Sequence, residues 1–266
     1  MYSGMKKAFV MLIALAAVGV IAAPIHAATI QFDFGTGAGT YSGTNAPANT
    51  GSTTWNGLTG ADVSSGLLYA DGAAATGITV DFGAAQTAGI NQNINWNDGP
   101  TGTSNNLISG GNPLVGSLYD TALMEDWLYT DGRLNNDNTD VLAVRLKGFS
   151  PGLYDVFVIT REHLAFSRTY NVGIGIDTDN TTNLSNLNIS AITDGTGVTT
   201  WVEGKNYSKQ RLTVNSVNDW TAVIVESTNS DFAAIQGLQI VQVPEPGSLA
   251  LLGTALLGLL CLRRRK

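Results

Sequence analysis

The sequence predicts a mostly β protein: a single antiparallel β-sandwich between an N-terminal signal peptide helix and a C-terminal transmembrane helix. Gly, Thr, Asn, Ser and Val are abundant among the 266 residues, and runs with the 3.6-residue period of a helix are almost absent. Short apolar segments with alternating polarity are separated by Gly, Asn and Asp loops, as in antiparallel sandwiches. An apolar run near each end predicts the two flanking helices.

The first segment has the three parts of a secretory signal peptide. Lys6 and Lys7 precede the apolar run AFVMLIALAAVGVIAA, which is followed by Pro-Ile-His-Ala-Ala. A charged region, an apolar region and small residues at the cleavage site define such a signal. We therefore expect residues 1–27 to be removed by cleavage after Ala27, with Ala28 as the second choice. The alternative is an N-terminal membrane anchor.

Eight strands are expected in the part that remains, and one short helix. In the fifth of them Tyr170, Val172 and Ile174 share one face and Asn171 and Gly173 the other, which is the two-residue period of a half-buried strand. The expected strands are Thr29–Phe34, Thr76–Phe82, Val141–Leu146, Leu153–Thr160, Arg168–Ile176, Gln210–Val214, Trp220–Glu226 and Ile235–Val241. The helix is expected at Ser117–Tyr129, with Leu118, Ala122 and Trp127 on one side.

The third and fourth of these strands are expected to form a hairpin. Leu142, Val144 and Leu146 would face Tyr154, Val156 and Val158, and the link at 148–152 contains Pro-Gly, a common turn corner. Residues 36–60 and 97–113 are rich in Gly, Ser, Thr and Asn and are expected to be loops. Since no separate hydrophobic pattern follows them, we expect residues 28–242 to form one ectodomain.

The last segment, residues 243–266, has the composition of a membrane anchor. Pro244, Glu245 and Pro246 prevent a helix from continuing upstream, and no charge occurs from Ser248 to Leu262. These 15 residues would span about 22 Å as a helix, against a hydrocarbon core of about 30 Å, and basic side chains can reach the interface to narrow the gap. The basic cluster Arg263, Arg264, Arg265 and Lys266 would stay in the cytoplasm. The alternative is a helix buried in the core.

The tail resembles the PEP-CTERM sorting signal of Gram-negative bacteria. The residues that carry the resemblance are the sorting motif Pro244-Glu245-Pro246, the Leu, Gly and Ala helix, and the basic cluster. In that family an exosortase, a membrane enzyme, recognises the tail and removes it in bacteria that make exopolysaccharide. The resemblance implies an inner-membrane-inserted precursor that is delivered to the cell surface or extracellular matrix, with the exosortase as partner.

Charge and cysteine content limit what the ectodomain can do. Without the six basic residues of the terminal segments and without Glu245, eight basic and 20 acidic residues remain. This balance disfavours nucleic acid, whose recognition depends on Lys and Arg at phosphates. The single cysteine, Cys261, lies in the tail, so no disulfide is possible in the ectodomain.

A second resemblance concerns the ectodomain. FDFG at 32–35, the hairpin around Gly148-Phe149, and the closing segment Ala234–Ile240 are similar to galactose-binding-like jelly-roll modules. The resemblance implies a jelly-roll-like sandwich, and modules of that type often bind carbohydrate.

Catalytic and zinc-binding patterns are weak. Removal of the signal peptide would leave His163 as the only histidine, which excludes a histidine-rich or cysteine-based zinc site, and no serine lies in a G-x-S-x-G elbow. Glu125, Asp126, Asp155 and Glu162 could supply the paired carboxylates of a glycosidase, but the sequence does not place two of them at the required spacing. We therefore assign no catalytic residues.

Two groups of residues are candidates for ligand binding. Asp131, Asn135, Asp137 and Asp140 lie in one loop and offer the oxygen ligands that Ca²⁺ prefers, although Asn and Asp are also good turn formers. Trp55-Asn56 and Trp96-Asn97 lie in polar loops, where an indole could stack on a sugar ring and an amide could bind its hydroxyls.

The alternative for each tryptophan is a plug at one end of the core, and Trp127 and Trp220 are expected in the core. The sequence therefore favours a non-catalytic surface or matrix protein with possible exopolysaccharide binding and structural calcium. An exported polysaccharide hydrolase on a sandwich scaffold is the alternative function.

Overall fold

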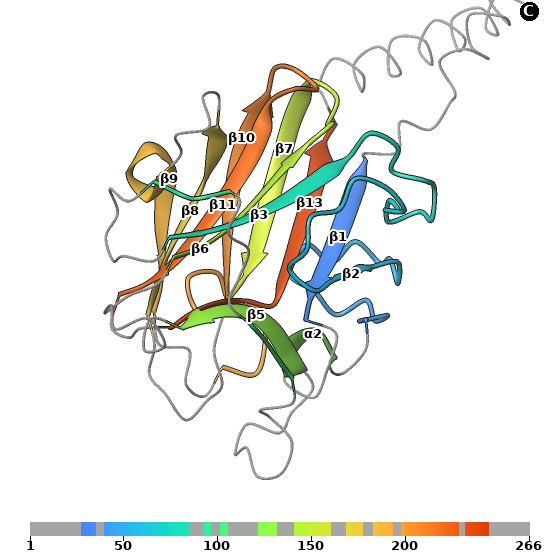
Figure 1. The fold of residues 1–266 in the computed structure, drawn as a ribbon. Coiled ribbons are helices and arrows are strands. Elements are labelled where there is room, and N and C mark those ends of the chain that lie inside the picture. Colours follow the sequence, from blue (N-terminus) through green and yellow to red (C-terminus); the bar gives the residue numbers. More distant parts are fainter. Residues whose placement is uncertain are drawn as a thin grey trace, which may run out of the picture. The chain divides into compact units, whose positions relative to one another are not determined.

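The structure is a computed structural model that describes residues 28–35, 40–85, 93–96, 102–105, 122–131, 141–160, 169–177, 183–193, 198–228 and 232–244. Residues Ala28–Gln242 form one compact unit, separate from the two terminal segments. Within the described residues the chain is mostly β, as the sequence predicts, and its strands form two five-stranded sheets and a small third sheet (Figure 1).

The first sheet contains both ends of the ectodomain. Its central strands β1 (Thr29–Phe34) and β13 (Gly237–Val243) are antiparallel neighbours, with Thr29 opposite Val241. The short strand β2 (Asn56–Leu58) adds to β1 in parallel. On the other side of β13 lie β7 (Gly152–Ile159) and then β10 (Tyr207–Val214).

The second sheet is fully antiparallel and has β6 (Val141–Lys147) and β11 (Trp220–Ser227) near its centre. Its order is β3 (Thr79–Ala85), β6, β11, β8 (Tyr170–Asp177) and β9 (Asn188–Ile192). The third sheet contains β12 (Phe232–Ile235), β5 (Asp126–Asp131) and β4 (Gly102–Asn105). Two short helical turns are α2 (Ala122–Glu125) and η2 (Leu184–Asn186).

The main hydrophobic core lies between the two large sheets. Phe32 and Ile240 come from the first sheet, Val144 and Val223 from the second, and none is more than 2% exposed. The residues of β8 that share a face in the sequence pattern, such as Val172 and Ile174, also belong to this core, as predicted. A fully buried side chain of this kind stabilises the fold by about 1.5–3 kcal/mol relative to an exposed one.

The predicted hairpin between Val141–Leu146 and Leu153–Thr160 is wrong in its pairing. The two strands belong to different sheets, because β6 pairs with β3 and β11 whereas β7 pairs with β10. The inward side chains of β6 and β7 do share one core, but across the sandwich and not along a ladder. Gly148, at φ 98°, turns the chain out of one sheet and into the other.

The predicted helix at Ser117–Tyr129 is also wrong over half of its described part. Only Ala122–Glu125 is helical, and β5 begins at Asp126. Residues 117–121 lie outside the described residues. Trp127 is nonetheless fully buried, as predicted for a core residue, because it packs against Ala234 of the paired strand β12.

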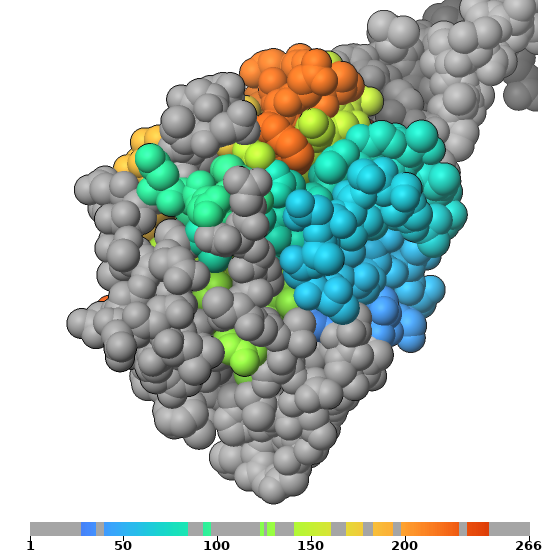
Figure 2. Space-filling model, viewed as in Figure 1, coloured from blue at the N-terminus to red at the C-terminus, as the bar shows by residue number. Residues whose placement is uncertain are grey.

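The outward edge of β3 is occupied by loop residues. Val80 exchanges two backbone hydrogen bonds with Val63, at 2.8 and 3.0 Å, and the N–H of Ala84 donates to the carbonyl of Asn95. Between them the N–H of Phe82 donates to Oδ1 of Asp62 at 3.0 Å. Residues 40–85, which include this covering loop, form a continuous cyan-to-teal surface in the space-filling view (Figure 2).

Candidate ligand-binding face

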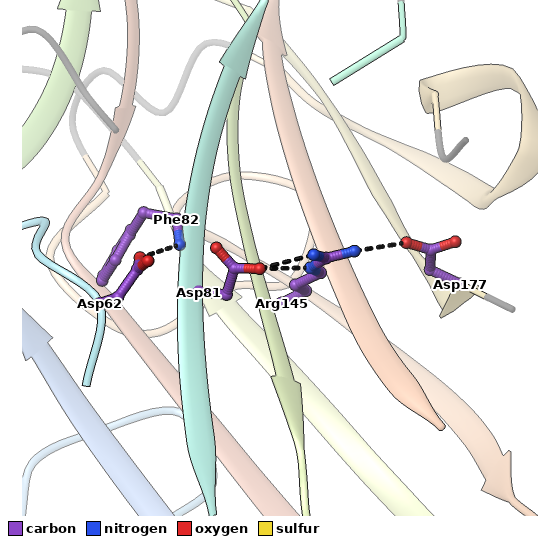
Figure 3. Close-up of polar contacts among 5 residues, drawn as sticks. All are labelled: Asp62, Asp81, Phe82, Arg145 and Asp177. Carbon is purple, nitrogen blue, oxygen red and sulfur yellow. Dashed lines mark hydrogen bonds and ion pairs between the residues drawn. The ribbon is translucent and has the colours of Figure 1, made fainter. Parts of the chain in front are cut away.

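The outer face of the second sheet has an arginine at its centre. Arg145 lies on β6, opposite Asp81 of β3 on one side and Ala222 of β11 on the other. Its Nε and Nη2 lie 2.7 and 2.6 Å from Oδ2 of Asp81, and its Nη1 donates to Oδ2 of Asp177 at 3.2 Å (Figure 3). One guanidinium therefore links three strands, β3, β6 and β8.

Two indoles cover the same guanidinium. The Cζ atom of Arg145 is 4.2 Å from the ring centroid of Trp96 and 4.3 Å from that of Trp220. Cations at this distance are attracted to an indole face. The ammonium of Lys147 also lies 4.5 Å from the Trp220 centroid. We call Asp81, Trp96, Arg145, Asp177 and Trp220 the arginine cluster.

Gly83 of β3 leaves the space that the ring of Trp96 occupies on this face. A Cβ on Gly83 would lie 2.7 Å from Cε3 of Trp96, so only glycine permits this approach. Trp96 follows the bridge between Ala84 and Asn95 and packs with Ile94 on this face. Its Nε1 is buried and has no hydrogen-bond partner within the part of the chain that the structure describes. Trp96 and Trp220 are themselves half-buried.

The charges of the cluster balance once the neighbouring Lys147 is included. Arg145 and Lys147 face Asp81 and Asp177, which gives these four side chains no net formal charge in an otherwise acidic ectodomain. Burial raises the pKa of the Asp81 carboxyl, and the hydrogen bond and charge of Arg145 oppose that rise. The side chains of Arg145 and Asp177 are only 9% and 0% exposed. The arrangement therefore fixes two indoles in a rigid, nearly neutral surface.

Trp55 and Asn56 lie in a different place from Trp96. Trp55 is 8% exposed, packs edge-on against Tyr41, and donates from Nε1 to the carbonyl of Gly43 at 3.1 Å. The amide of Asn56 donates to Gln31 and Leu68 carbonyls at 2.9 Å and accepts from the Leu68 N–H at 2.8 Å. This placement favours the core-plug alternative for Trp55, and ligand binding there stays a prediction.

A further half-buried tryptophan, Trp201, lies near the outer face of the first sheet. Its Nε1 donates to Oδ1 of Asn45 at 3.0 Å, and its ring meets Tyr207 edge-on. Asp155 and Arg211 form an exposed bidentate pair on β7 and β10, with bonds of 2.7 and 3.1 Å. Asp155 and Arg211 do not share a site with the arginine cluster, because β7 and β10 belong to the first sheet and the cluster lies on the second.

Several predicted site residues lie outside the described residues. They are Asn97, the calcium candidates Asn135, Asp137 and Asp140, most of the sorting motif (Glu245 and Pro246), and the basic cluster Arg263–Lys266. His163, to which the sequence assigns no site, also lies outside them. Asp131 ends β5. Pro244 is described and exposed, directly after β13. The calcium site therefore stays a prediction.

Sequence reasoning missed Arg145 and misplaced Trp220. Trp220 was expected in the core but is half-buried on the outer face, because it occupies the outward position of β11 opposite Asp177. A signal for Arg145 was present: it is the only charged residue between Val141 and Leu146, at an outward position of the strand. Its partners could not be read off, since they lie 32 to 75 positions away.

The fold is a β-sandwich with a candidate ligand-binding face. A comparison with protein families identifies a sorting signal at the C-terminal end. Residues 242–266 match the family model of the PEP-CTERM protein-sorting motif. The tail thus carries a PEP-CTERM sorting signal, which implies export and exosortase-mediated sorting to the cell surface. None of the curated proteins matches the chain.

No helix within the described ranges has the length and hydropathy needed to cross a membrane. The apolar stretch from Ser248 to Leu262 lies outside those ranges, so the transmembrane helix of the tail stays a prediction.

Proposed function

We propose that this exported protein is a non-catalytic component of the cell surface or extracellular matrix that binds exopolysaccharide through the arginine cluster. The observation that carries the proposal is the pair of half-buried indoles, Trp96 and Trp220, fixed on both sides of Arg145. A sugar ring has an apolar C–H face that packs on an indole, and the neighbouring Asp81 and Lys147 side chains can bind hydroxyl groups.

The rigidity of the face supports this function. A flexible tryptophan loses side-chain entropy when a ligand orders it, at a cost of about 0.5–1.5 kcal/mol for each immobilised side chain. Arg145 already fixes both indoles, and the seat on Gly83 restricts Trp96 further. The face is therefore ordered before a ligand binds.

The charge of the ectodomain favours a neutral polymer. Eight basic and 20 acidic residues would repel a polymer rich in carboxylate or sulfate groups. The balanced charges of the arginine cluster and Lys147 place no excess of positive charge beside the indoles. Polar hydroxyl groups on a neutral polysaccharide match this mixture of aromatic rings and paired ions.

A retention assay on an insoluble neutral glucan tests the proposal. Trp220→Ala should lower the affinity about fivefold, because loss of one exposed aromatic contact costs about 1 kcal/mol. Trp201→Ala is the matched control, since Trp201 is also half-buried but lies beside Tyr207 of the first sheet. Equal retention of the wild type and the Trp220 variant would refute this binding face, provided that a thermal melt shows both to be folded.

A variant of the buried Trp55 distinguishes an effect on stability from an effect on glucan binding. Trp55→Ala should lower the melting temperature markedly, because truncation of a buried aromatic costs about 3–5 kcal/mol. A folded Trp55 variant with unchanged melting temperature and reduced retention would instead move the binding site to Trp55 and Asn56.

A further inference from the structure

The first and last residues of the ectodomain unit are hydrogen-bonded to each other. The N–H of Gln242 donates to the carbonyl of Ala28 at 2.9 Å, and the N–H of Ala28 lies 3.2 Å from Oε1 of Gln242. This terminal clasp, Ala28 with Gln242, continues the antiparallel pairing of β1 and β13 (Figure 1). The ectodomain therefore begins and ends at the same end of the first sheet.

Two turns lie at that end of the sheet. Gly152 begins β7 and pairs with Val214, the last residue of β10. A Cβ on Gly152 would lie 3.3 Å from Nε2 of Gln242, and the N–H of Gly148 donates to the carbonyl of Val217. We call the terminal clasp and the turns 148–152 and 215–219 the terminal pole.

The terminal pole is poor in charge. Asp219 is the only ionisable residue in the two turns, and its Oδ2 accepts the N–H groups of Asn215 and Ser216, both at 2.9 Å. Val217 is 49% exposed in one turn, and Pro151 is exposed in the other. A surface of this kind loses little solvation free energy when another protein covers it.

The sorting signal follows the terminal pole almost without a linker. Only six positions separate Gln242 from Ser248, where the apolar part of the tail begins. Six extended residues span at most about 20 Å. While the tail is inserted in the membrane, the terminal pole must therefore lie within about 20 Å of the bilayer, where a membrane enzyme acts.

We propose that the terminal pole is the surface that the folded ectodomain presents to the exosortase. The enzyme then contacts the turn around Val217 in addition to the Pro-Glu-Pro motif. The terminal clasp supports this contact, because it holds the strand that leads into the motif in a fixed register with β1. This inference rests on the sorting signal and is independent of polysaccharide binding.

A pair of matched substitutions tests the contact. Val217→Glu places a carboxylate on the terminal pole, and Val202→Glu places the same charge on a valine that is 40% exposed near the opposite end of β10. The eight residues of β10 separate the two ends by about 26 Å. The measurement is the rate of tail removal in a host with an active exosortase, followed by the size of the full-length chain.

We expect Val217→Glu to slow tail removal roughly five- to tenfold and Val202→Glu to leave the rate unchanged. An eight-residue Gly/Ser linker between Val243 and Pro244 should also slow removal, because it separates the motif from the pole.

Equal rates for the two glutamate variants, or a linker variant processed at the wild-type rate or faster, would overturn the proposal. Glucan retention should stay unchanged in every variant, so this result is read separately from the proposed function. Thermal melts verify that each ectodomain is folded.

Discussion

Arg145 reaches Asp177 across an intervening strand. Arg145 lies on β6 and Asp177 on β8, and β11 runs between them with Ala222 opposite Arg145. The small Ala222 side chain leaves room for the guanidinium to pass over β11 and donate to Asp177 at 3.2 Å. The side chain of Asp177 is 0% exposed, and Arg145 compensates its charge there.

Loss of Arg145 should therefore destabilise the fold strongly. Arg145→Met should cost about 3–5 kcal/mol in the free energy of unfolding, because it removes the cation that Asp81 and the buried Asp177 share. Chemical denaturation measures this change. Arg211→Met is the control: its pair with Asp155 is exposed and screened by solvent, so the unfolding midpoint should hardly move. Similar losses in the two variants would contradict the structural role of the arginine cluster.

The link between β6 and β7 should not tolerate a side chain at Gly148. A Cβ there would lie 2.1 Å from the carbonyl oxygen of Gly77, at a φ of 98°. We expect Gly148→Ala to lower the free energy of unfolding by about 3 kcal/mol or more, from backbone strain and overpacking together.

Gly51 provides the control for backbone strain alone. It has a φ of 71° and no atom within 4 Å of a Cβ, so Gly51→Ala should cost only about 1–2 kcal/mol. A larger loss at Gly51 than at Gly148, measured by urea denaturation, would show that the close approach to Gly77 is not limiting.

Acid should weaken the contribution of Asp155. The hydrogen bond from Arg211 lowers the pKa of the Asp155 carboxyl below its ordinary value of 3.8. Because the pKa is lower in the folded state, this carboxylate stabilises the fold above pH 3.8 and loses that effect as the pH falls toward the folded value.

Asp155→Asn should therefore flatten the pH dependence of the unfolding midpoint between about pH 5 and about pH 3. The comparison requires urea denaturation of both proteins across this range. A steeper acid loss in the variant than in the wild type would contradict the assignment.

Calcium binding by the loop at 131–140 is testable without a structure of that loop. If Asp131, Asn135, Asp137 and Asp140 hold Ca²⁺, a calcium concentration 100 times the dissociation constant should raise the free energy of unfolding by about 2.7 kcal/mol. Asp137→Asn should reduce this shift. An identical thermal melt with calcium and with a chelator would remove calcium from consideration.

The sorting motif should be essential for removal of the tail. Replacement of Pro244, Glu245 and Pro246 by alanines should leave the full-length chain in the membrane fraction, because the exosortase recognises this signal. The fold should be unaffected, since the compact unit ends at Gln242. Immunoblots of cell fractions measure the outcome, and an unchanged rate of tail loss would contradict it.

Local sequence patterns predict eight of the described strands but miss β2, β4, β5, β9 and β12, and they do not predict which strands pair. The alternation through Tyr170, Val172 and Ile174 identifies β8, since one face of that strand is buried. The pairing of strands does not follow from such local patterns. The strands β6 and β7 are adjacent in sequence, yet the chain turns at Gly148 and they belong to opposite sheets. The strand β5 was also misread as helix, because three apolar residues spaced four and five apart imitate a helical face.

The candidate site depends on contacts that are distant in sequence. Arg145 meets Trp96 and Trp220 through the order of strands in the second sheet, and no local pattern specifies that order. The tail is the opposite case. Its signal consists of consecutive residues, so the sequence alone was sufficient to identify it.

The occupied edge of β3 limits how copies of this protein can associate when many of them lie close together. Proteins anchored on a cell surface or embedded in a matrix meet many copies of themselves, and an open strand edge would let those copies join into fibrils. The outward N–H groups of Val80, Phe82 and Ala84 are already bonded to Val63, Asp62 and Asn95. A neighbouring molecule therefore cannot extend the sheet by pairing along this strand.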